Sequence, residues 1–558
     1  MPTIFVSDIA LAATVSPSDS NDGFDTLGLG QVISGAESYS AGSRRLEDPG
    51  GLAGTMASIT AGMFVAVTGG TGWTPGLYEL ELVDNSGGIL VFKNAPGVNV
   101  TTDDAPVLST GPKATVAGAI AAFPATPTSA WTSYAANAAV RLAIASSTGN
   151  FDLPASVSYS NYATAAFHHK ICGATIGGVI SPTGAPPVTI RPVLTLSEGA
   201  TTATYPNSLN PTITASAGVF TASMVGQGIV FNGVSGSWLI TSYTSPTQVV
   251  VSGTVGAGGG GGGRAFSVGY HTGTPFFQLV TGSSAYYLDI EGITFNGTAN
   301  GRTATYCLDL ATANGDVTVT NCRATASTNS GIRVLARRCH LSGTVVYAAG
   351  SHGFELTSTA LNDLRMVGCE AYSNANDGFN ISGSSEGTAL IECIAHNNTR
   401  HGFQFAGSNR STLVVRCVAA ANAQHGFDMS SGVDLHVIGC VSANNGTTSS
   451  HRQFSFGTTT NGTRALVLLG NAAFAAGSTV ATDATDASSG QLASLSASPL
   501  RSTAVGTFDG RLANSFRRSL STYVPGLAGL GVSQTSPPGL SQVDPPGAGG
   551  GSRVLSRP

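Results

Sequence analysis

The chain has 558 residues, of which 73 are glycine, and its formal net charge is −5. Charged residues make up only 10% of the sequence and hydrophobic residues 42%, so the chain holds too much apolar material to remain disordered. No basic stripe is visible, which argues against nucleic-acid binding. No apolar run reaches the roughly 18 residues that a membrane span needs, so no membrane insertion is predicted.

The first residues, MPTIFVSDIALAATV, lack a basic segment, and Asp8 interrupts their apolar run. We therefore expect no secretory signal peptide and predict that the protein folds in a reducing cytoplasm. The eight cysteines show neither zinc-site spacings nor a CxxC redox motif. The sequence thus predicts no cofactor and no metal.

The first half of the chain divides into three predicted regions. Residues 1–110 form an N-terminal β-module with an extended arm, because short apolar strands alternate there with glycine-rich turns. Residues 111–205 hold a capping helix over Ser129–Ser147, with Ser129 as its N-cap, followed by irregular coils. Residues 206–270 form an inserted β-module that ends in a glycine-rich loop. Each module holds a tryptophan, Trp73 or Trp238, interpreted as a core residue, with stacking on sugars as the alternative.

Residues 271–481 contain a repeat of about 24 residues. In each copy a cysteine precedes a glycine by nine positions, as in Cys369 and Gly378 or Cys393 and Gly402. Apolar residues alternate with polar ones over short stretches, which indicates short strands. Such strands bury their apolar faces only if successive coils stack at about 4.8 Å and close parallel ladders. We therefore predict an all-β fold, a right-handed parallel β-helix of about eight regular coils.

This repeat resembles the right-handed β-helix superfamily of pectate lyases, polygalacturonases and phage tailspikes, and is most similar to the tailspikes and other virion-associated β-helix proteins. The resemblance extends from Phe277 to Asn471. The catalytic motifs of the family, such as the paired aspartates of the polygalacturonases, are not matched here. Because tailspikes are commonly homotrimers, the resemblance implies a trimer.

Three kinds of residue recur at fixed offsets and predict ladders along the stack. Cysteines in one slot are interpreted as small apolar core residues, with a redox or metal stack as the alternative. Asparagines four positions before the glycine are expected to hydrogen-bond at a corner. His352, Asp377, His401 and His425 precede the glycine and are interpreted as a solvent-facing polar rung, with a proton relay or weak metal site as the alternative. The first two ladders comprise Cys322, Cys369, Cys393, Cys417 and Cys440, and Asn374, Asn398 and Asn422.

A fourth row alternates with the apolar strand residues and therefore points outward. Its carboxylates and amides suit the hydroxyl groups of a polysaccharide, so we predict a glycan-binding face. Asp309 and Glu355 lie two coils apart, about 9.5 Å, which suits an inverting carboxylate pair, although Arg333 between them weakens a general acid. Glu370 and Glu392 form a second candidate catalytic pair. The row comprises Asp309, Arg333, Glu355, Asn380, Gln404 and Asp428.

Residues 482–558 lose the period and end in a Pro/Gly-rich segment, predicted to be an arm that orders against other virion or surface structural proteins. The predicted function is that of a virion-associated spike or fibre protein, made in the host cytoplasm, that binds host surface polysaccharide. One alternative is a polysaccharide depolymerase, either a lyase or an inverting hydrolase. Another is an adhesive or structural β-helix protein at the bacterial cell surface.

Overall fold

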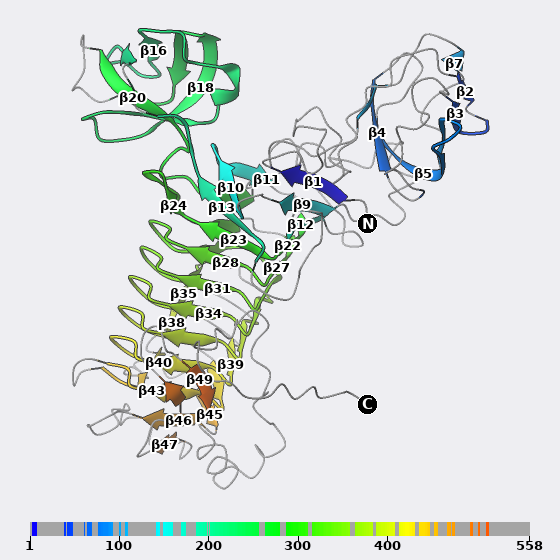
Figure 1. Ribbon diagram of the computed structural model, residues 1–558. Helices are drawn as coiled ribbons and strands as arrows, with labels where there is room; N and C mark the ends of the chain where they lie inside the picture. The colour runs from blue at the N-terminus through cyan, green and yellow to red at the C-terminus, as the bar shows by residue number, and fades with distance from the viewer. Residues whose placement is uncertain are drawn as a thin grey trace, which may run out of the picture.

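The structure is a computed structural model in which three long parallel sheets form the faces of a β-helix (Figure 1). The coils from β9 to β44 pass through sheet 1, sheet 2 and sheet 3 in turn, and each strand pairs with the equivalent strand of the next coil. The described residues are 3–7, 38–40, 42–47, 61, 64–69, 76–92, 100–101, 107–109, 141–145, 149–159, 169–174, 186–197, 199, 201–255, 263–279, 286–310, 315–357, 363–382, 387–407, 412–429, 435–446, 451–455, 466–469, 471–474, 492–494, 500–502 and 509–512.

Sheets 1 and 2 each have eleven strands, and sheet 3 has nine. Sheet 1 contains β1 (Thr3–Ser7), β9 (Arg141–Ala145), β12 (His169–Ala174), β22 (Tyr286–Glu291), β27 (Gly315–Thr320), β30 (Cys339–Ser342), β33 (Arg365–Val367), β36 (Ala389–Ile391), β39 (Thr412–Val415), β42 (Leu435–Ile438) and β45 (Leu466–Leu469). Sheet 2 contains β10 (Asn150–Leu153), β13 (Val188–Pro192), β23 (Ile293–Asn296), β28 (Arg323–Thr325), β31 (Val345–Tyr347), β34 (Glu370–Tyr372), β37 (Ile394–His396), β40 (Val418–Ala420), β43 (Val441–Ala443), β46 (Asn471–Phe474) and β47 (Leu492–Ser494). Sheet 3 contains β11 (Val157–Tyr159), β21 (Phe277–Leu279), β26 (Leu308–Leu310), β29 (Ile332–Val334), β32 (Phe354–Leu356), β35 (Phe379–Ser382), β38 (Phe403–Ala406), β41 (Phe427–Asp428) and β44 (Phe454–Ser455).

Two antiparallel sheets of seven strands each form separate modules. The N-terminal module contains β2 (Ser38–Ser40), β3 (Arg45–Glu47), β4 (Phe64–Gly69), β5 (Gly76–Asp84), β6 (Ile89–Phe92), β7 (Val100–Thr101) and β8 (Val107–Ser109). The inserted module contains β14 (Leu194–Leu196), β15 (Thr202–Thr204), β16 (Thr212–Ala215), β17 (Gly228–Phe231), β18 (Trp238–Ser245), β19 (Gln248–Val251) and β20 (Arg264–Gly269). Two hairpins complete the strands: β24 (Thr298–Ala299) with β25 (Arg302–Thr303), and β48 (Leu500–Ser502) with β49 (Asp509–Leu512).

The inserted module interrupts a single coil, between its sheet 2 strand β13 and its sheet 3 strand β21. The chain leaves and returns at one point, because the Tyr270 amide donates a hydrogen bond to the Val193 carbonyl at 2.9 Å. Arg302, only 2% exposed, joins module and coil by donating from Nη2 to the carbonyl and the hydroxyl of Ser267. Within the module, Trp238 is partly buried and packs on Phe231 with ring centroids 5.8 Å apart, whereas Trp73 lies outside the described residues.

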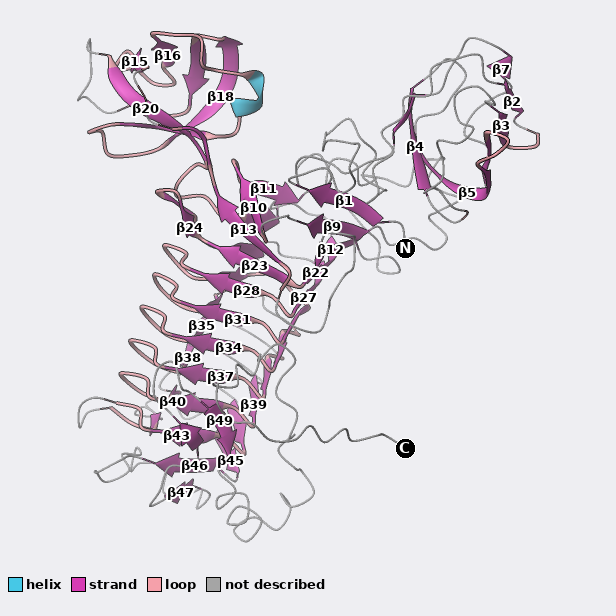
Figure 2. Cartoon of the chain, viewed as in Figure 1, coloured by secondary structure: helices cyan, strands magenta, loops and turns pink. Residues whose placement is uncertain are grey.

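The helix predicted over Ser129–Ser147 is wrong where the structure describes it. Arg141–Ala145 form strand β9, paired in parallel with β1 on one side and β12 on the other, and Ile144 is fully buried. Two ladders and core burial therefore outweigh the local helix preference of the alanine-rich sequence. Residues 129–140 lie outside the described residues. The described residues contain one helical turn, the 3-10 helix η1 (Ala222–Met224) (Figure 2). No helix among the described residues is long and apolar enough to cross a membrane.

One part of the solenoid core is a stack of identical side chains. Phenylalanines of five successive coils lie parallel, with neighbouring ring centroids 4.8 to 4.9 Å apart. All five are 0% exposed, and burying each phenyl ring stabilises the fold by about 1.5–3 kcal/mol. The stack comprises Phe354, Phe379, Phe403, Phe427 and Phe454.

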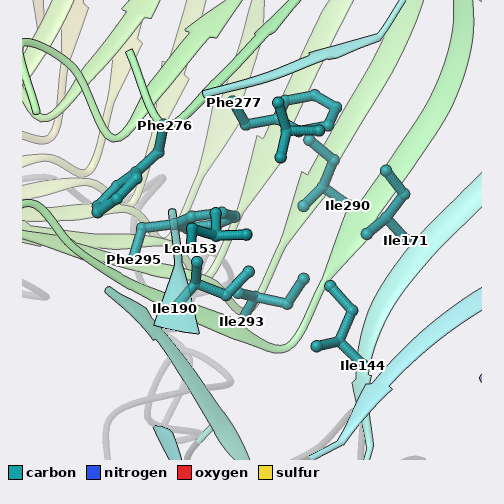
Figure 3. Close-up of a pocket in the computed structure, with 10 residues that line it drawn as sticks. Ile144, Leu153, Ile171, Ile190, Phe276, Phe277, Ile290, Ile293 and Phe295 are labelled. Carbon is teal, nitrogen blue, oxygen red and sulfur yellow. The ribbon is translucent and has the colours of Figure 1, made fainter. Parts of the chain in front are cut away.

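The first coils close over a small cavity with a wholly apolar lining (Figure 3). Its side chains come from all three sheets, among them Ile144, Leu153 and Phe277. Figure 3 shows these residues facing one another across the end of the core, with Phe276 and Phe295 beside them. Because no polar group lines it, the cavity offers nothing that would orient a ligand, and we assign it to core packing.

The asparagine ladder is continuous and buried, as its period predicts. Asn374 Nδ2 donates to Asn398 Oδ1 at 2.9 Å, and Asn398 Nδ2 is equally close to Asn422 Oδ1. Each Oδ1 also accepts the backbone N–H of the preceding asparagine at 3.1 Å. A fourth member, Asn445, accepts from Asn422 at 2.8 Å. The ladder thus satisfies backbone and side-chain donors at a corner where regular pairing is interrupted.

All eight cysteines are free and buried. The predicted slot is interrupted once, because Thr344 precedes its strand where Cys322 and Cys369 precede theirs. Cys369 Sγ lies 3.5 Å from the Leu341 carbonyl oxygen, and burial raises the pKa of the Cys322 thiol to about 12. Thiols held protonated in this way are core residues, and no cluster of three potential metal ligands occurs among the described residues.

We expect Asn398→Ala to lower the free energy of unfolding by about 3 kcal/mol, because it strips partners from two buried donors of Asn374 and from the Ala371 carbonyl. Denaturant unfolding followed by circular dichroism measures the change. Gln404→Ala, on the outer face of sheet 3, is the matched control and is expected to stay within about 0.5 kcal/mol of wild type. Equal losses in the two variants would contradict the role of the ladder.

We also expect no cysteine to react with a thiol reagent at pH 8 in the folded protein, and all eight to react once guanidinium unfolds it. The physical reason is burial, which raises the pKa of Cys307 and Cys339 to about 12 and blocks access. Fewer than eight thiols in the unfolded protein would reveal disulfides, and rapid reaction of the folded protein would show that the slot is accessible.

Candidate functional site

The register of sheet 3 places the six predicted glycan-face residues in one row, from Asp309 on β26 to Asp428 on β41. Their strand neighbours, such as Leu308 and Leu310, are 0% exposed and fill the core, so alternation sets the row on the outer face. The row is less open than the sequence suggests. Asp309 is 4% exposed and Asp428 8%, because neighbouring side chains pack over them.

At the N-terminal end of the row, Arg333 holds Asp309 through two hydrogen bonds. Arg333 Nε lies 2.8 Å from Asp309 Oδ1, and Nη2 lies 2.5 Å from Oδ2. The guanidinium carbon also sits 4.3 Å from the ring centroid of Tyr306, a cation–π contact. Both carboxylate oxygens of Asp309 are therefore engaged, which is unfavourable for a general acid.

Glu355 lies two rungs after Asp309 and one rung after Arg333, and no ion pair between Glu355 and Arg333 occurs among the described residues. Ser330 Oγ donates to Glu355 Oε2 at 2.7 Å, and no hydrogen bond to Oε1 occurs among the described residues. The register thus brings Asp309 and Glu355 onto one row, two coils apart, as predicted from the repeat. Their chemistry differs, however, since one carboxylate is bound by an arginine and the other is open to a ligand on one oxygen.

The centre of the row is bordered by a histidine–aspartate pair. His352 Nδ1 lies 3.0 Å from Asp377 Oδ2, and Asn380 Nδ2 lies 3.0 Å from His352 Nε2. Arg400 Nη1 is 3.6 Å from the same Asp377 oxygen. Asn380 therefore couples this border to the row itself.

The solvent-facing interpretation of the polar rung is wrong for two of its residues. Asp377 is 0% exposed and His401 is 4% exposed. The turn that carries them folds tightly against the next coil, so the rung side chains hydrogen-bond to the backbone of that coil instead of water: Asp377 Oδ1 accepts the His401 amide at 3.1 Å. Buried polar groups in such turns need partners, and the rung supplies them.

The second candidate catalytic pair is not brought together on the row. Glu370 lies on β34 of sheet 2, where His396 Nε2 approaches its Oε1 at 2.9 Å. Glu392 lies at the corner before β37, in a left-handed backbone conformation with φ 54°, and pairs with Arg416 at 2.7 Å. Each carboxylate thus has a basic partner of its own, away from sheet 3.

Sequence reasoning missed Tyr306, Arg400 and Asn445. Asn445 escaped because its turn runs on to Gln453, which takes the place of the glycine from which the offset was counted. Counting from the cysteine would have found it, since Cys440 precedes Asn445 by the same five positions as Cys417 precedes Asn422. Tyr306 and Arg400 sit in turns, where no strand alternation marks the direction of a side chain.

Residues 306–473 match a family model described as the right handed beta helix region. No curated protein matches the chain. Among solved structures, pectate lyase Pel9A shares 14% identity over 72% of this chain and 84% of that chain, with a TM-score of 0.42. ORF18 of Geobacillus virus E2 shares 13% identity over 64% and 54%, with a TM-score of 0.33. The tailspike protein gp49 from Pseudomonas phage LKA1 shares 13% identity over 59% and 60%, with a TM-score of 0.21.

The matched residues run from just before β26 to β46 and lie within the three stacked parallel sheets. Over these residues the chain matches the family model of the right-handed β-helix and has the corresponding fold.

Proposed function

We propose that the outer face of sheet 3 binds a polysaccharide, and that the protein does so as a virion-associated spike or fibre. The observation that carries the proposal is the row of six polar residues, in register on six successive coils. Successive rungs stand about 4.8 Å apart, close to the length of one sugar unit, so an extended glycan can meet a polar group at each step.

The chemistry of the row suits hydroxyl groups. Glu355 and Gln404 bring acceptor oxygens, and the amide of Gln404 adds a donor. Asn380 is buried and its Nδ2 is engaged with His352, so it supports the row instead of facing a ligand. Tyr306 is buried under Arg333 and supports the first rungs from below. A mixed set of donors and acceptors on a rigid sheet, with few flexible side chains to order, favours sugar binding at a low entropic cost.

Binding is favoured over catalysis by the state of the predicted catalytic carboxylates. Asp309 is bound by Arg333, Glu370 by His396, and Glu392 by Arg416. An inverting hydrolase needs two carboxylates free to act on opposite sides of a sugar. Glu355 alone does not supply that pair.

We expect the double substitution Glu355→Ala and Gln404→Ala to weaken binding of a recognised glycan at least tenfold, since each lost hydrogen bond contributes about 1 kcal/mol. A panel of bacterial surface polysaccharides, followed by calorimetry on those that bind wild type, measures the effect. Thr318→Ala with His340→Ala, outward on sheet 1, is the control and should bind as wild type. Unchanged affinity in the sheet 3 variant would remove the row from the binding site. Release of reducing ends or unsaturated uronates by wild type would replace binding by depolymerisation.

The spike role further implies a homotrimer, in which terminal arms contact other structural proteins. This aspect of the proposal is supported by the family resemblance of the repeat and not by the binding face. Sedimentation equilibrium of the full chain at micromolar concentration is expected to give three times the mass of 55.9 kDa. A monomer across that concentration range would contradict the spike assembly while leaving the glycan proposal intact.

A further inference from the structure

Two histidines of the polar rung act as hydrogen-bond acceptors for the backbone of the next coil. The His425 amide donates to His401 Nδ1 at 3.2 Å, and the Arg452 amide donates to His425 Nδ1 at 2.8 Å. Asp377 Oδ1 has the same role in the preceding coil, where it accepts the amide of His401. Four successive coils are therefore joined at this corner by three side-chain-to-backbone bonds of the same kind.

This geometry fixes the protonation of both rings. A nitrogen that accepts an N–H must carry a lone pair, so Nδ1 is unprotonated in His401 and His425, and each neutral ring carries its proton on Nε2. In this tautomer the Arg400 Nη2, 3.3 Å from His401 Nε2, is a contact between two donors and not a hydrogen bond. The two rings stack with centroids 5.0 Å apart and an angle of 8° between their planes. A proton added to either Nδ1 would set one N–H against another, and protonation of both rings would place two cations face to face.

The charged and titratable neighbours of this pair are mixed in sign. Asp377, Asp428, Arg400 and His425 surround His401. Asp428, Arg452, His401 and His451 surround His425. The nearest carboxylate oxygen to the His401 Nε2 is Asp428 Oδ2, at 3.7 Å, which is too long for a strong hydrogen bond. Burial outweighs the two carboxylates and lowers the pKa of His401 to about 4, and it lowers the pKa of His425 as well.

We propose that His401 and His425 form an acid-sensitive latch, which holds the C-terminal coils in register at neutral pH and releases their corner when the imidazoles are protonated. The latch acts on the solenoid itself and does not depend on glycan binding. A histidine is suited to this place because its Nδ1 occupies the position of a carboxylate or amide oxygen, yet loses its acceptor on protonation. At the equivalent position of the preceding coil, Asp377 supplies a carboxylate oxygen, which remains an acceptor when the imidazoles are protonated.

The direction of the pH effect follows from the lowered pKa. The unfolded or opened segment binds protons at the ordinary histidine pKa of 6.5, whereas in the closed latch the pKa of His401 is lowered to about 4 and that of His425 is lowered as well. The opened state thus holds more protons in this interval, so the stability contributed by the latch is complete above pH 6.5 and is lost as the pH falls toward 4. The opening constant of the corner is expected to rise by about 10- to 100-fold across that interval.

Hydrogen exchange measured by mass spectrometry on the full chain tests the latch at pH 7.5, 6.0 and 4.5, with rates corrected for intrinsic exchange. We expect peptides spanning 396–428 and 445–455 to lose protection in acid, while peptides of the N-terminal coils between 315 and 350 keep theirs. The double variant His401→Asn and His425→Asn retains an acceptor oxygen at both rungs without a titrating imidazole. It is expected to stay protected at pH 4.5. Equal loss in variant and wild type, or no loss in either, would overturn the proposal.

A spectroscopic measurement on the wild type covers the case in which the variant does not fold. Nitrogen-15 shifts of labelled histidine side chains report both tautomer and pKa. The proposal requires the signals of two histidines in the Nε2–H tautomer with pKa values below 6.5. One of these signals should disappear when His401 is replaced, and the other when His425 is replaced. An Nδ1–H tautomer or an ordinary pKa at these positions would refute the latch.

Discussion

The constraint on which the rest of the structure depends is the in-register stacking of coils through three parallel sheets. Each strand is only a few residues long and would not persist alone, but it pairs with an identical neighbour above and below. Once the register is set, inward positions of successive coils stand on one another, and the phenylalanine stack and asparagine ladder follow from it. The corners decide the register, because a slip of one residue would turn every core side chain outward.

The same register builds the candidate site. A residue that faces outward on one coil is repeated about 4.8 Å away on the next, so a row of polar groups arises without any loop to position it. The residue type at each rung then sets the local chemistry of the row. Asp309 is paired with Arg333, whereas Glu355 has one carboxylate oxygen that can bind a ligand. The latch histidines border this face through Asp428, so the corner and the row share one rigid support.

The sequence predicted the features that recur in every coil. It did not predict the residues at which the repeat is interrupted, nor the burial that depends on packing between coils. Period and alternation located the coils, the buried Phe379 and Cys393, and the row on sheet 3. They did not foresee Thr344 in the cysteine slot or Asn445 beyond a lengthened turn, because substitutions and insertions leave no periodic signal. Strand β9 was misassigned because its partners β1 and β12 are distant in sequence, and local propensity carries no information about them. The burial of Asp377 and His401 depends on how tightly a turn folds onto the next coil, which residue type alone does not reveal.

The inserted module leaves and rejoins the solenoid at neighbouring backbone positions, with Val193 and Tyr270 bonded to each other. To the β-helix this whole domain is topologically equivalent to a short turn. Its folding can therefore proceed separately, around its own hydrophobic core, and the ladders on either side need no adjustment to its size. Such a junction makes the module exchangeable: recombination that swaps it for an unrelated domain with closely spaced ends would leave the solenoid intact, provided that the new domain supplies an acceptor for the buried Arg302.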